Sequence, residues 1–437
     1  MINLMKTRNI YSLLYVTFVA VALVACNDYD AAQTAYEEIV DSDVTTTPPN
    51  IDSAWELQLI PNVGQHSGEV FVYKDKKYDK LFTRTLGWNG GIGVLWAFND
   101  SYFGVVDAET RARGNCNFPH NSIMIQTTVG GSLGETDDDL RWLVDYIQTN
   151  DPDGEGYYQA YTHIAPDETI MEETDEEHFY QIGGATIFDN NGVKELQMLW
   201  GEIDNHEGKM TRTGTCLAVY SLEGQPGNST YLKRISKNEE FNTDDVGYGS
   251  TIWKDEDGHI YLYVTENNRP LVARTTTHDL TSEWEYYIRD LSGNFMWQKM
   301  YPTKEERTRS TIMENNYVCS MPQIFKKGDY YYMIGQAVSY GHSVYLYRGE
   351  TPYGPFTDQK ILFNVPYSVD KIGNQYYKNL LRVNLHLELA REGELVFSTN
   401  TDADTAGDNF DFPGSADFCR PYFYRIFNWE SIYDEDD

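Results

Sequence analysis

Basic residues are scarce in this chain of 437 residues. The sequence has 34 lysines and arginines against 67 aspartates and glutamates, which gives a formal net charge of −33 at pH 7. Such a surface repels phosphate groups, so the composition excludes general nucleic-acid binding. Aromatic residues make up 14% of the chain, which is too many for a disordered acidic polymer. The length allows one large β domain or two to three smaller ones.

Long apolar runs are also scarce, and the clearest one lies at residues 11–24. It follows a short basic segment and is too short for a comfortable membrane span. Small residues directly before Cys26 resemble the lipobox of bacterial lipoproteins, and the acidic residues 27–30 resemble the surface-export signal of Bacteroidota lipoproteins. The resemblance implies a signal peptide at 1–25, lipidation of Cys26 and an outer-membrane, cell-surface location; an ordinary signal peptide or a buried helix is the alternative. Polar residues 26–52 predict a flexible acidic tether.

Cysteine is scarce as well, with five in the chain. None of the spacings is Cys-x-x-Cys, so a zinc site is not expected. The four cysteines after the lipobox allow disulfides with three connectivities in an exported protein. A bond between Cys116 and Cys419 would close a ring of repeats.

An internal repeat dominates the remaining sequence. Four segments share an apolar strand, a glycine-containing turn and a second strand that is usually aromatic, and a fifth copy is degenerate; they are 183–202, 248–267, 320–337, 383–400 and 86–104. The pattern aligns Ile187, Ile252, Ile324 and Leu387. With four strands per repeat it predicts an all-β fold, a five-bladed β-propeller over residues 53–437 with an insertion at about 129–178. A β-sandwich is the alternative. Residues 138–148 carry the best helical spacing of apolar residues.

Several motifs resemble a family of Bacteroidota surface lipoproteins of uncharacterised domain type. They are Leu86-Gly-Trp-Asn-Gly-Gly91, Trp96 to Gly104, Asn117 to Ile123, Leu385 to Leu389, Gly414 to Phe418, Arg420 to Phe423 and Arg425 to Trp429. More distantly, the chain is similar to five-bladed propeller glycoside hydrolases of the arabinanase and endo-D-arabinanase types. That resemblance implies polysaccharide cleavage by carboxylates in the central funnel. The chain has Asn99-Asp100 where the relatives have Gly-Asp, and His386-Leu-Glu388 where they have His-Pro-Glu.

The repeat also nominates catalytic carboxyl groups. Counting from the hairpin glycines, the second strands end at Asp100, Glu202, Glu266, Gln336 and Asn400. Glycoside hydrolysis needs one protonated carboxyl and one ionised carboxylate, and three carboxyl groups at one rim meet that need. We assign Asp100 as base or nucleophile and Glu266 as general acid, with Glu202 as its competitor. Apolar residues surround Asp100, so the roles of Asp100 and Glu266 can be reversed.

Other polar and aromatic residues are expected at the same rim as substrate contacts. These candidates are Trp88, Asn89, His120, Asn121, Gln336, Arg382, His386, Glu388 and Arg420. His386 is a core residue, a site residue or, by the resemblance, a contact of a central cation. Trp200 and Trp253 are either sugar-stacking residues or blade packing, and packing is the better interpretation for Trp253.

The expected function follows from these residues. No phosphate-binding loop, dinucleotide fingerprint or HExxH motif is present, so neither a cofactor nor a catalytic metal is expected. The acidic runs 137–139 and 172–177 are a solvated loop or a structural Ca²⁺ site. The sequence predicts a surface-anchored glycoside hydrolase acting on a complex polysaccharide, furanose-containing ones included. The alternatives are a non-catalytic glycan-binding lipoprotein of a polysaccharide-utilisation system and an adhesion propeller, and the expected partner is a polysaccharide or oligosaccharide.

Overall fold

The computed structural model describes the parts of the chain that build the sheets. These are residues 57–59, 71–73, 76–78, 84–86, 93–99, 103–106, 109–110, 112–117, 120–129, 132–133, 140–142, 144–148, 158–162, 165–166, 176–206, 209–224, 231–242, 246–313, 318–337, 341, 343–364, 371–372, 375–376, 379–387, 390, 392–402, 413–415 and 421–436. No helix among them is long and apolar enough to cross a membrane.

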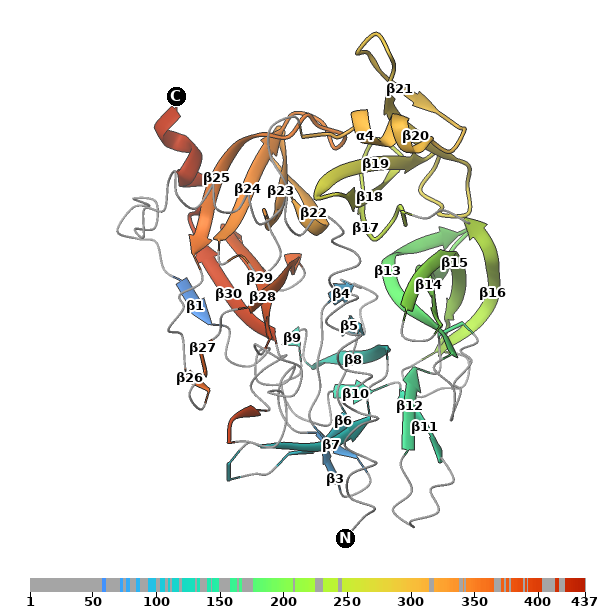
Figure 1. The fold of residues 1–437 in the computed structure, drawn as a ribbon, viewed down its shortest axis with the longest axis vertical. Coiled ribbons are helices and arrows are strands. Elements are labelled where there is room, and N and C mark those ends of the chain that lie inside the picture. The colour runs from blue at the N-terminus through green and yellow to red at the C-terminus, as the bar shows by residue number, and fades with distance from the viewer. Residues whose placement is uncertain are drawn as a thin grey trace.

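The fold is an all-β propeller in which antiparallel sheets stand around a centre (Figure 1). Three sheets are meanders in chain order, and a fourth is closed by an N-terminal strand. The first comprises β13 (Glu176–Asn190), β14 (Val193–His206), β15 (Lys209–Leu222) and β16 (Tyr231–Asn242). The second comprises β17 (Thr251–Lys254), β18 (Ile260–Glu266), β19 (Arg269–Thr275), β20 (Trp284–Arg289) and β21 (Phe295–Gln298). The third comprises β22 (Cys319–Lys327), β23 (Tyr330–Gln336), β24 (Ser343–Gly349) and β25 (Thr357–Asn364). The fourth comprises β28 (Asn379–Leu385), β29 (Glu394–Asp402), β30 (Pro421–Phe427) and β1 (Leu57–Leu59).

One further sheet, which we call the first sheet, lies earlier in the chain. It has the order β10-β8-β5-β4 and is built from β4 (Arg84–Leu86), β5 (Gly93–Asn99), β8 (Asn121–Val129) and β10 (Leu140–Trp142), with β9 (Ser132–Leu133) on β8. The remaining strands form two-stranded ladders: β2 (Phe71–Tyr73) with β3 (Lys76–Tyr78), β6 (Phe103–Val106) with β7 (Arg113–Asn117), β11 (Val144–Gln148) with β12 (Tyr158–Thr162), and β26 (Lys371–Ile372) with β27 (Gln375–Tyr376).

Two expectations from the sequence are corrected here. The structure shows four regular blades rather than five, because the chain leaves the first sheet after β5 to form the β6–β7 hairpin and returns as β8, which pairs with β5. Residues 138–148 contribute strands β10 and β11 in place of the expected helix, since pairing with β8 and β12 satisfies their backbone. The described helices are α4 (Lys304–Arg309) and the 3₁₀ segment η5 (Trp429–Asp436).

Tight turns fix the register of the hairpins that carry the candidate residues. The β13–β14 turn is Asn191-Gly192 and the β18–β19 turn is Asn267-Asn268, and all four residues have positive φ, between 53° and 90°. Two consecutive residues of this kind form the turn that matches the twist of paired strands, and Asn and Gly adopt it at least cost. Strand pairing places Ile187, Ile252 and Ile324 on the innermost strands, as predicted.

The last repeat differs from the predicted alignment. Strand β28 ends at Leu385, and Leu387 lies beyond it with 40% of its surface exposed. The connection from β28 to Glu394, the first residue of β29, is longer than the two-residue turns between β13 and β14 and between β22 and β23. Leu387 therefore belongs to this connection and not to a strand.

Apolar clusters between neighbouring sheets hold the molecule together. Leu95, Ala97 and Ile123 of the first sheet pack with Met198 and Trp200 of the β13–β16 sheet, and all five are buried. Similar clusters follow between the next sheets, and the inner strands contact one another in the order β13, β17, β22, β28 and β4. Burying a large apolar side chain stabilises a fold by about 1.5–3 kcal/mol. The interfaces between sheets are therefore what fixes the inner strands around the centre.

Candidate functional site

The second strands of the five large sheets lead to the same end of the propeller, which we call the rim. The rim is marked by Asn99, Glu202, Glu266, Gln336 and Asn400 on β5, β14, β18, β23 and β29. In a propeller the second strands run in the same direction, so these positions share one face. Strand β14 continues past Glu202 to His206, whereas β18 and β23 stop at Glu266 and Gln336.

Asn99 and Asn121 join the first sheet to the backbone of β13. The Asn121 side chain donates from Nδ2 to the carbonyl oxygen of Tyr180 at 2.7 Å, and the backbone N–H of Ile182 donates to Asn99 Oδ1 at 2.7 Å. Tyr180 is the cross-strand partner of Glu202. Both asparagine side chains are almost fully buried. A buried amide bonded to backbone is a strong positional constraint, because leaving either group without a partner costs about 1–3 kcal/mol.

Other predicted contacts on the rim have structural partners. His120 stacks on Phe179, with ring centroids 3.5 Å apart. Gln336 is buried and donates from Nε2 to the carbonyl oxygen of Gly341 at 2.6 Å. Arg382 is half-buried at an irregularity of β28 and has a positive φ of 53°. His120 therefore packs on the face of β13 that carries Phe179, whereas Tyr180 and Glu202 belong to the other face. The amide of Gln336 bonds within its own loop.

Glu266 has a partner that the sequence did not suggest. Arg307 donates from Nε to Glu266 Oε2 at 3.0 Å and from Nη2 to Glu266 Oε1 at 3.2 Å. The side chains of Arg307 and Glu266 are 4% and 20% exposed. Both carboxylate oxygens thus accept guanidinium N–H bonds, whereas a general acid must carry a proton on one of them. This geometry fits a structural ion pair better than the acid role predicted for Glu266.

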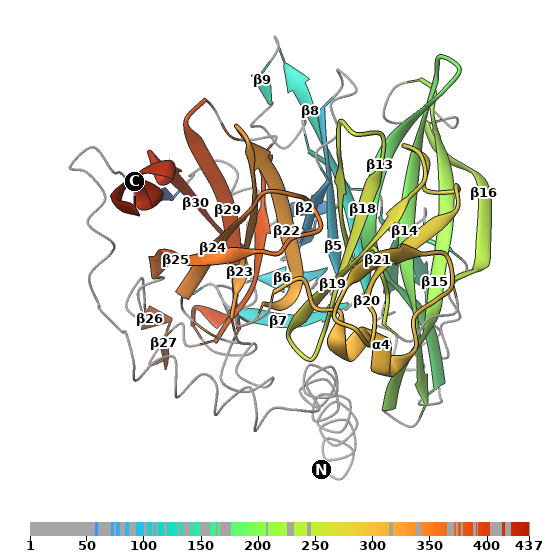
Figure 2. The ribbon, with the colours of Figure 1, turned by 90° about the horizontal axis from the view of Figure 1, so that it is seen from above.

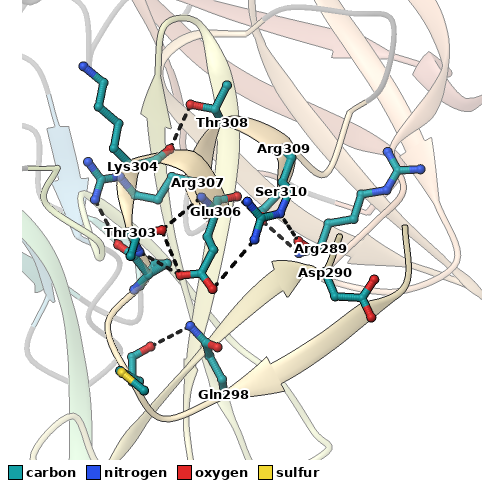
Figure 3. Close-up of polar contacts among 12 residues, drawn as sticks. Arg289, Asp290, Gln298, Thr303, Lys304, Glu306, Arg307, Thr308, Arg309 and Ser310 are labelled. Carbon is teal, nitrogen blue, oxygen red and sulfur yellow. Dashed lines mark hydrogen bonds and ion pairs between the residues drawn. The ribbon is translucent and has the colours of Figure 1, made fainter. Parts of the chain in front are cut away.

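The helix that carries Arg307 is fixed at both ends (Figure 3). A capping box joins Thr303 and Glu306: the Thr303 backbone N–H donates to Glu306 Oε2 at 2.8 Å, and this bond holds the pKa of Glu306 below its usual value. At the other end Arg309 donates to the carbonyl oxygen of Arg289, and Ser310 accepts from the Arg289 backbone N–H. These bonds attach α4 to β20, beside which it lies in Figure 2.

Two residues expected near the substrate lie in the core. His386 is 1% exposed, bonds through Nε2 to Ser398 Oγ at 2.8 Å, and lies 5.9 Å from the ring of Trp96. His386 lies about five residues, or about 16 Å, along the chain from Leu381, which pairs with Asn400 at the rim. It therefore does not reach the rim. Trp200 is fully buried and donates to the hydroxyl of Tyr220 at 3.1 Å, so it packs between sheets and offers no face to a sugar.

Part of the predicted site lies outside the residues that the structure describes. These positions are Asp100, Trp88, Asn89, Glu388, Arg420, Cys26, Cys419 and the acidic run 137–139. Of the other acidic run, 172–177, only Glu176 and Glu177 belong to the described strands. Within the described part of the chain, no group of three His, Cys, Asp or Glu side chains is placed to hold a metal ion.

Sequence reasoning missed two features at the rim. The first is the Arg307–Glu266 pair, whose members are 41 residues apart in the sequence. The sequence signal for it was the Thr303-Lys-Glu-Glu306 capping box, which predicts the start of a helix. The second feature is a hydrogen-bonded pair of His178 and Asp204 on the part of the β13–β14 hairpin that extends beyond Glu202. Alternation along β14 places Asp204 on the same face as Glu202.

Comparison with known proteins gives one strong match and several weak ones. A Bacteroides ovatus protein of solved structure, provisionally described as a hydrolase, is 50% identical, covers 90% of this chain and 100% of its own, and has a TM-score of 0.71. The GH43_1 enzyme from Xanthomonas citri is 10% identical over 80% of this chain and 86% of its own, with a TM-score of 0.39. A GH43 β-1,3-galactosidase is 11% identical over 85% of this chain and 60% of its own, with a TM-score of 0.39. The last two likenesses are too low to indicate an activity.

Comparison with curated proteins finds no significant match. A family model, in contrast, matches residues 75–429, which include the first sheet, the rim and the strands of the four regular blades other than β1. The chain belongs to the family described as Domain of unknown function (DUF5005).

Proposed function

We propose that this protein is a glycoside hydrolase whose reacting carboxyl groups are Glu202, at the junction of the first sheet and β13, and Asp100, which follows the last residue of β5 in the sequence. One observation carries the proposal. Asn121 donates to the carbonyl oxygen of Tyr180, the residue opposite Glu202, and its cross-strand partner Asn99, directly before Asp100 in the chain, accepts from the backbone N–H of Ile182, two residues further along β13. Two carboxyl groups are what the hydrolysis of a glycosidic bond requires. The 50% identity to a protein provisionally described as a hydrolase supports the same class.

The position of Glu202 suggests its role. Glu202 is half-buried on the β14 face that packs, further along the strand, against Leu95, Ala97 and Ile123. We assign it the general-acid role that glycoside hydrolysis requires. Asp100 would then activate water or attack the sugar as the ionised partner. Because Glu266 is bound by Arg307, Glu202 replaces it as the proposed acid. The chemistry needs no cofactor.

Activity measurements on three variants test this assignment. Reducing ends released from arabinan, arabinoxylan, xylan and galactan are compared for the wild type, Asp100→Asn, Glu202→Gln and Glu266→Gln. We expect Asp100→Asn and Glu202→Gln each to lower the rate on the active substrate at least about hundredfold. Full activity of Glu202→Gln would refute the assignment. Retention on a glycan-containing gel without release of reducing ends from any substrate would favour the non-catalytic glycan-binding alternative.

The finer expectations on architecture and location belong to the same proposal. The inner strands β28 and β13 both contact β4, so we take the first sheet as an irregular fifth blade that completes the ring. An experimental structure in which β28 packs directly on β13 would refute this. We also propose that Cys26 is lipidated and anchors the protein at the outer face of the outer membrane, where it meets polysaccharide. Cys26→Ala should then move the protein from the membrane fraction to the soluble fraction.

A further inference from the structure

The β13–β14 hairpin extends beyond the rim. Its pairing continues past the Tyr180–Glu202 pair to His178 opposite Asp204 and Glu176 opposite His206. These strands contain 15 and 14 residues, compared with 7 each in β18 and β23, and Figure 2 shows them as long strands at the edge of the molecule. The apolar cluster that packs this sheet on the first sheet lies on the turn side of Glu202, at Leu196, Met198 and Trp200 of β14.

The two faces of this extension differ. On one face Phe179, Ile203 and Met210 form a small buried cluster. On the other face Glu202 is half-buried, and Asp204 is exposed. This second face continues the surface that packs on the first sheet lower down. This second face is therefore on the side of the first sheet, whose strand β5 ends at Asn99, directly before Asp100 in the sequence.

On the open face, His178 and Asp204 form a fixed polar pair. His178 Nδ1 and Asp204 Oδ1 are 2.7 Å apart, and the side chains are 33% and 52% exposed. The imidazole also meets the ring of Tyr180 edge-on, with centroids 5.0 Å apart and an interplanar angle of 90°. Tyr180 is buried. The imidazole is thus oriented by a carboxylate and by a rigid ring, and its Nε2 and Asp204 Oδ2 have no protein hydrogen-bond partner among the described residues.

We propose that the His178–Asp204 pair is a sugar-binding subsite next to Glu202. The pair offers one imidazole nitrogen and one carboxylate oxygen side by side, which suits two neighbouring hydroxyl groups of a sugar ring. Asp204 is two residues from Glu202 on the same face, about 7 Å along the strand. The subsite therefore takes the sugar unit adjacent to the one that is cleaved. Its place as a subsite rests on the proposed function.

A purely structural role makes a different prediction. An exposed histidine–carboxylate pair contributes little to stability, and one cross-strand pair near a hairpin end adds little more. If the pair only joined two strands, removing it would leave glycan binding unchanged. If the pair binds sugar, removal weakens binding while the fold stays intact.

The test uses the full-length protein and the one glycan of the four named above that the wild type retains most strongly. Glycan affinity is measured by gel retardation in the Glu202→Gln background, and KM and kcat are measured in the otherwise unchanged enzyme. We expect His178→Ala and Asp204→Asn each to weaken binding about tenfold, since one hydrogen bond to a charged group is worth about that factor. We expect KM to rise more than kcat falls. The matched control is Glu195→Gln, at the other end of β14, where the carboxylate bonds Asn190.

The outcomes separate the two proposals. Affinity within twofold of the control for both variants overturns the subsite, whatever the activity. A loss of affinity that follows a loss of folded protein, measured by thermal unfolding, also overturns it. Cleavage that survives Glu202→Gln overturns the catalytic assignment alone, because gel retardation still reports on His178 and Asp204. If none of the four glycans is retained, the subsite is refuted.

Discussion

The buried ion pair between Glu266 and Arg307 gives the sharpest test of the structure. Arg307 is 4% exposed and Glu266 is 20% exposed. Removing one partner of a buried pair typically costs about 3–5 kcal/mol, because the other charge is left buried. Glu266 keeps some contact with water, so we expect Arg307→Met to cost about 3 kcal/mol. Glu266→Gln should cost about 2–3 kcal/mol, since Arg307 also bonds the carbonyl oxygen of Pro302.

The double variant distinguishes an ion pair from two independent residues. Replacing both partners with apolar side chains of similar size is often close to neutral. Glu266→Met with Arg307→Met should therefore be more stable than Arg307→Met alone. Its remaining cost, about 1–3 kcal/mol, comes from the buried carbonyl oxygen of Pro302, which loses its Arg307 donor. Free energies of unfolding from denaturant titration measure this. The control is Lys299→Met, which breaks an exposed pair with Glu283 and should leave the free energy of unfolding close to that of the wild type.

Activity measured on the same variants completes the test. If Glu266 is a structural residue, Glu266→Gln should lower the free energy of unfolding of the protein. The folded fraction of this variant should keep most of its hydrolytic rate. A general acid would show the opposite: a rate lowered about 10²–10⁴-fold with little change in unfolding. That second pattern, or a double variant as unstable as Arg307→Met, would refute the structural role of the pair.

Three further predictions concern stability and pH. Trp200→Ala should lower the free energy of unfolding by about 3–5 kcal/mol, measured by denaturant titration, because the ring is fully buried; loss of glycan binding without loss of stability would contradict its packing role. Asn121→Leu should cost about 1–3 kcal/mol, since it leaves the buried carbonyl of Tyr180 without its donor, and should lower kcat on the active glycan; equal stability and rate would contradict the proposed junction. Thr303→Ala should destabilise α4 by about 1 kcal/mol at pH 7, seen as faster amide exchange in 304–309. The folded pKa of Glu306 is lowered from 4.5, so its contribution is full above that pH and is lost as the pH falls through the lower folded value; the effect of Thr303→Ala should shrink in acid.

The all-β architecture was readable from the sequence because strand pairing repeats locally. Asn191-Gly192 and Asn267-Asn268 reveal tight hairpins, and the apolar residues at Ile187, Ile252 and Ile324 keep their places on inner strands. The prediction failed where local pattern and long-range pairing diverge. Residues 138–148 have helical spacing, yet they pair with strands β8 and β12. Leu387 matches the repeat in sequence, yet its strand has already ended.

The candidate site shows the same division. The sequence identified a rim of carboxyl and amide residues, because the distance from each hairpin turn to the end of its strand is set by local pairing. Only the tertiary structure decided which carboxyl groups have partners. Glu266 meets Arg307 from a helix 41 residues away, and Glu202 faces a junction held by Asn99 and Asn121. A charged group's role depends on its neighbours in space, and packing between sheets brings together residues whose spacing carries no signal in the chain.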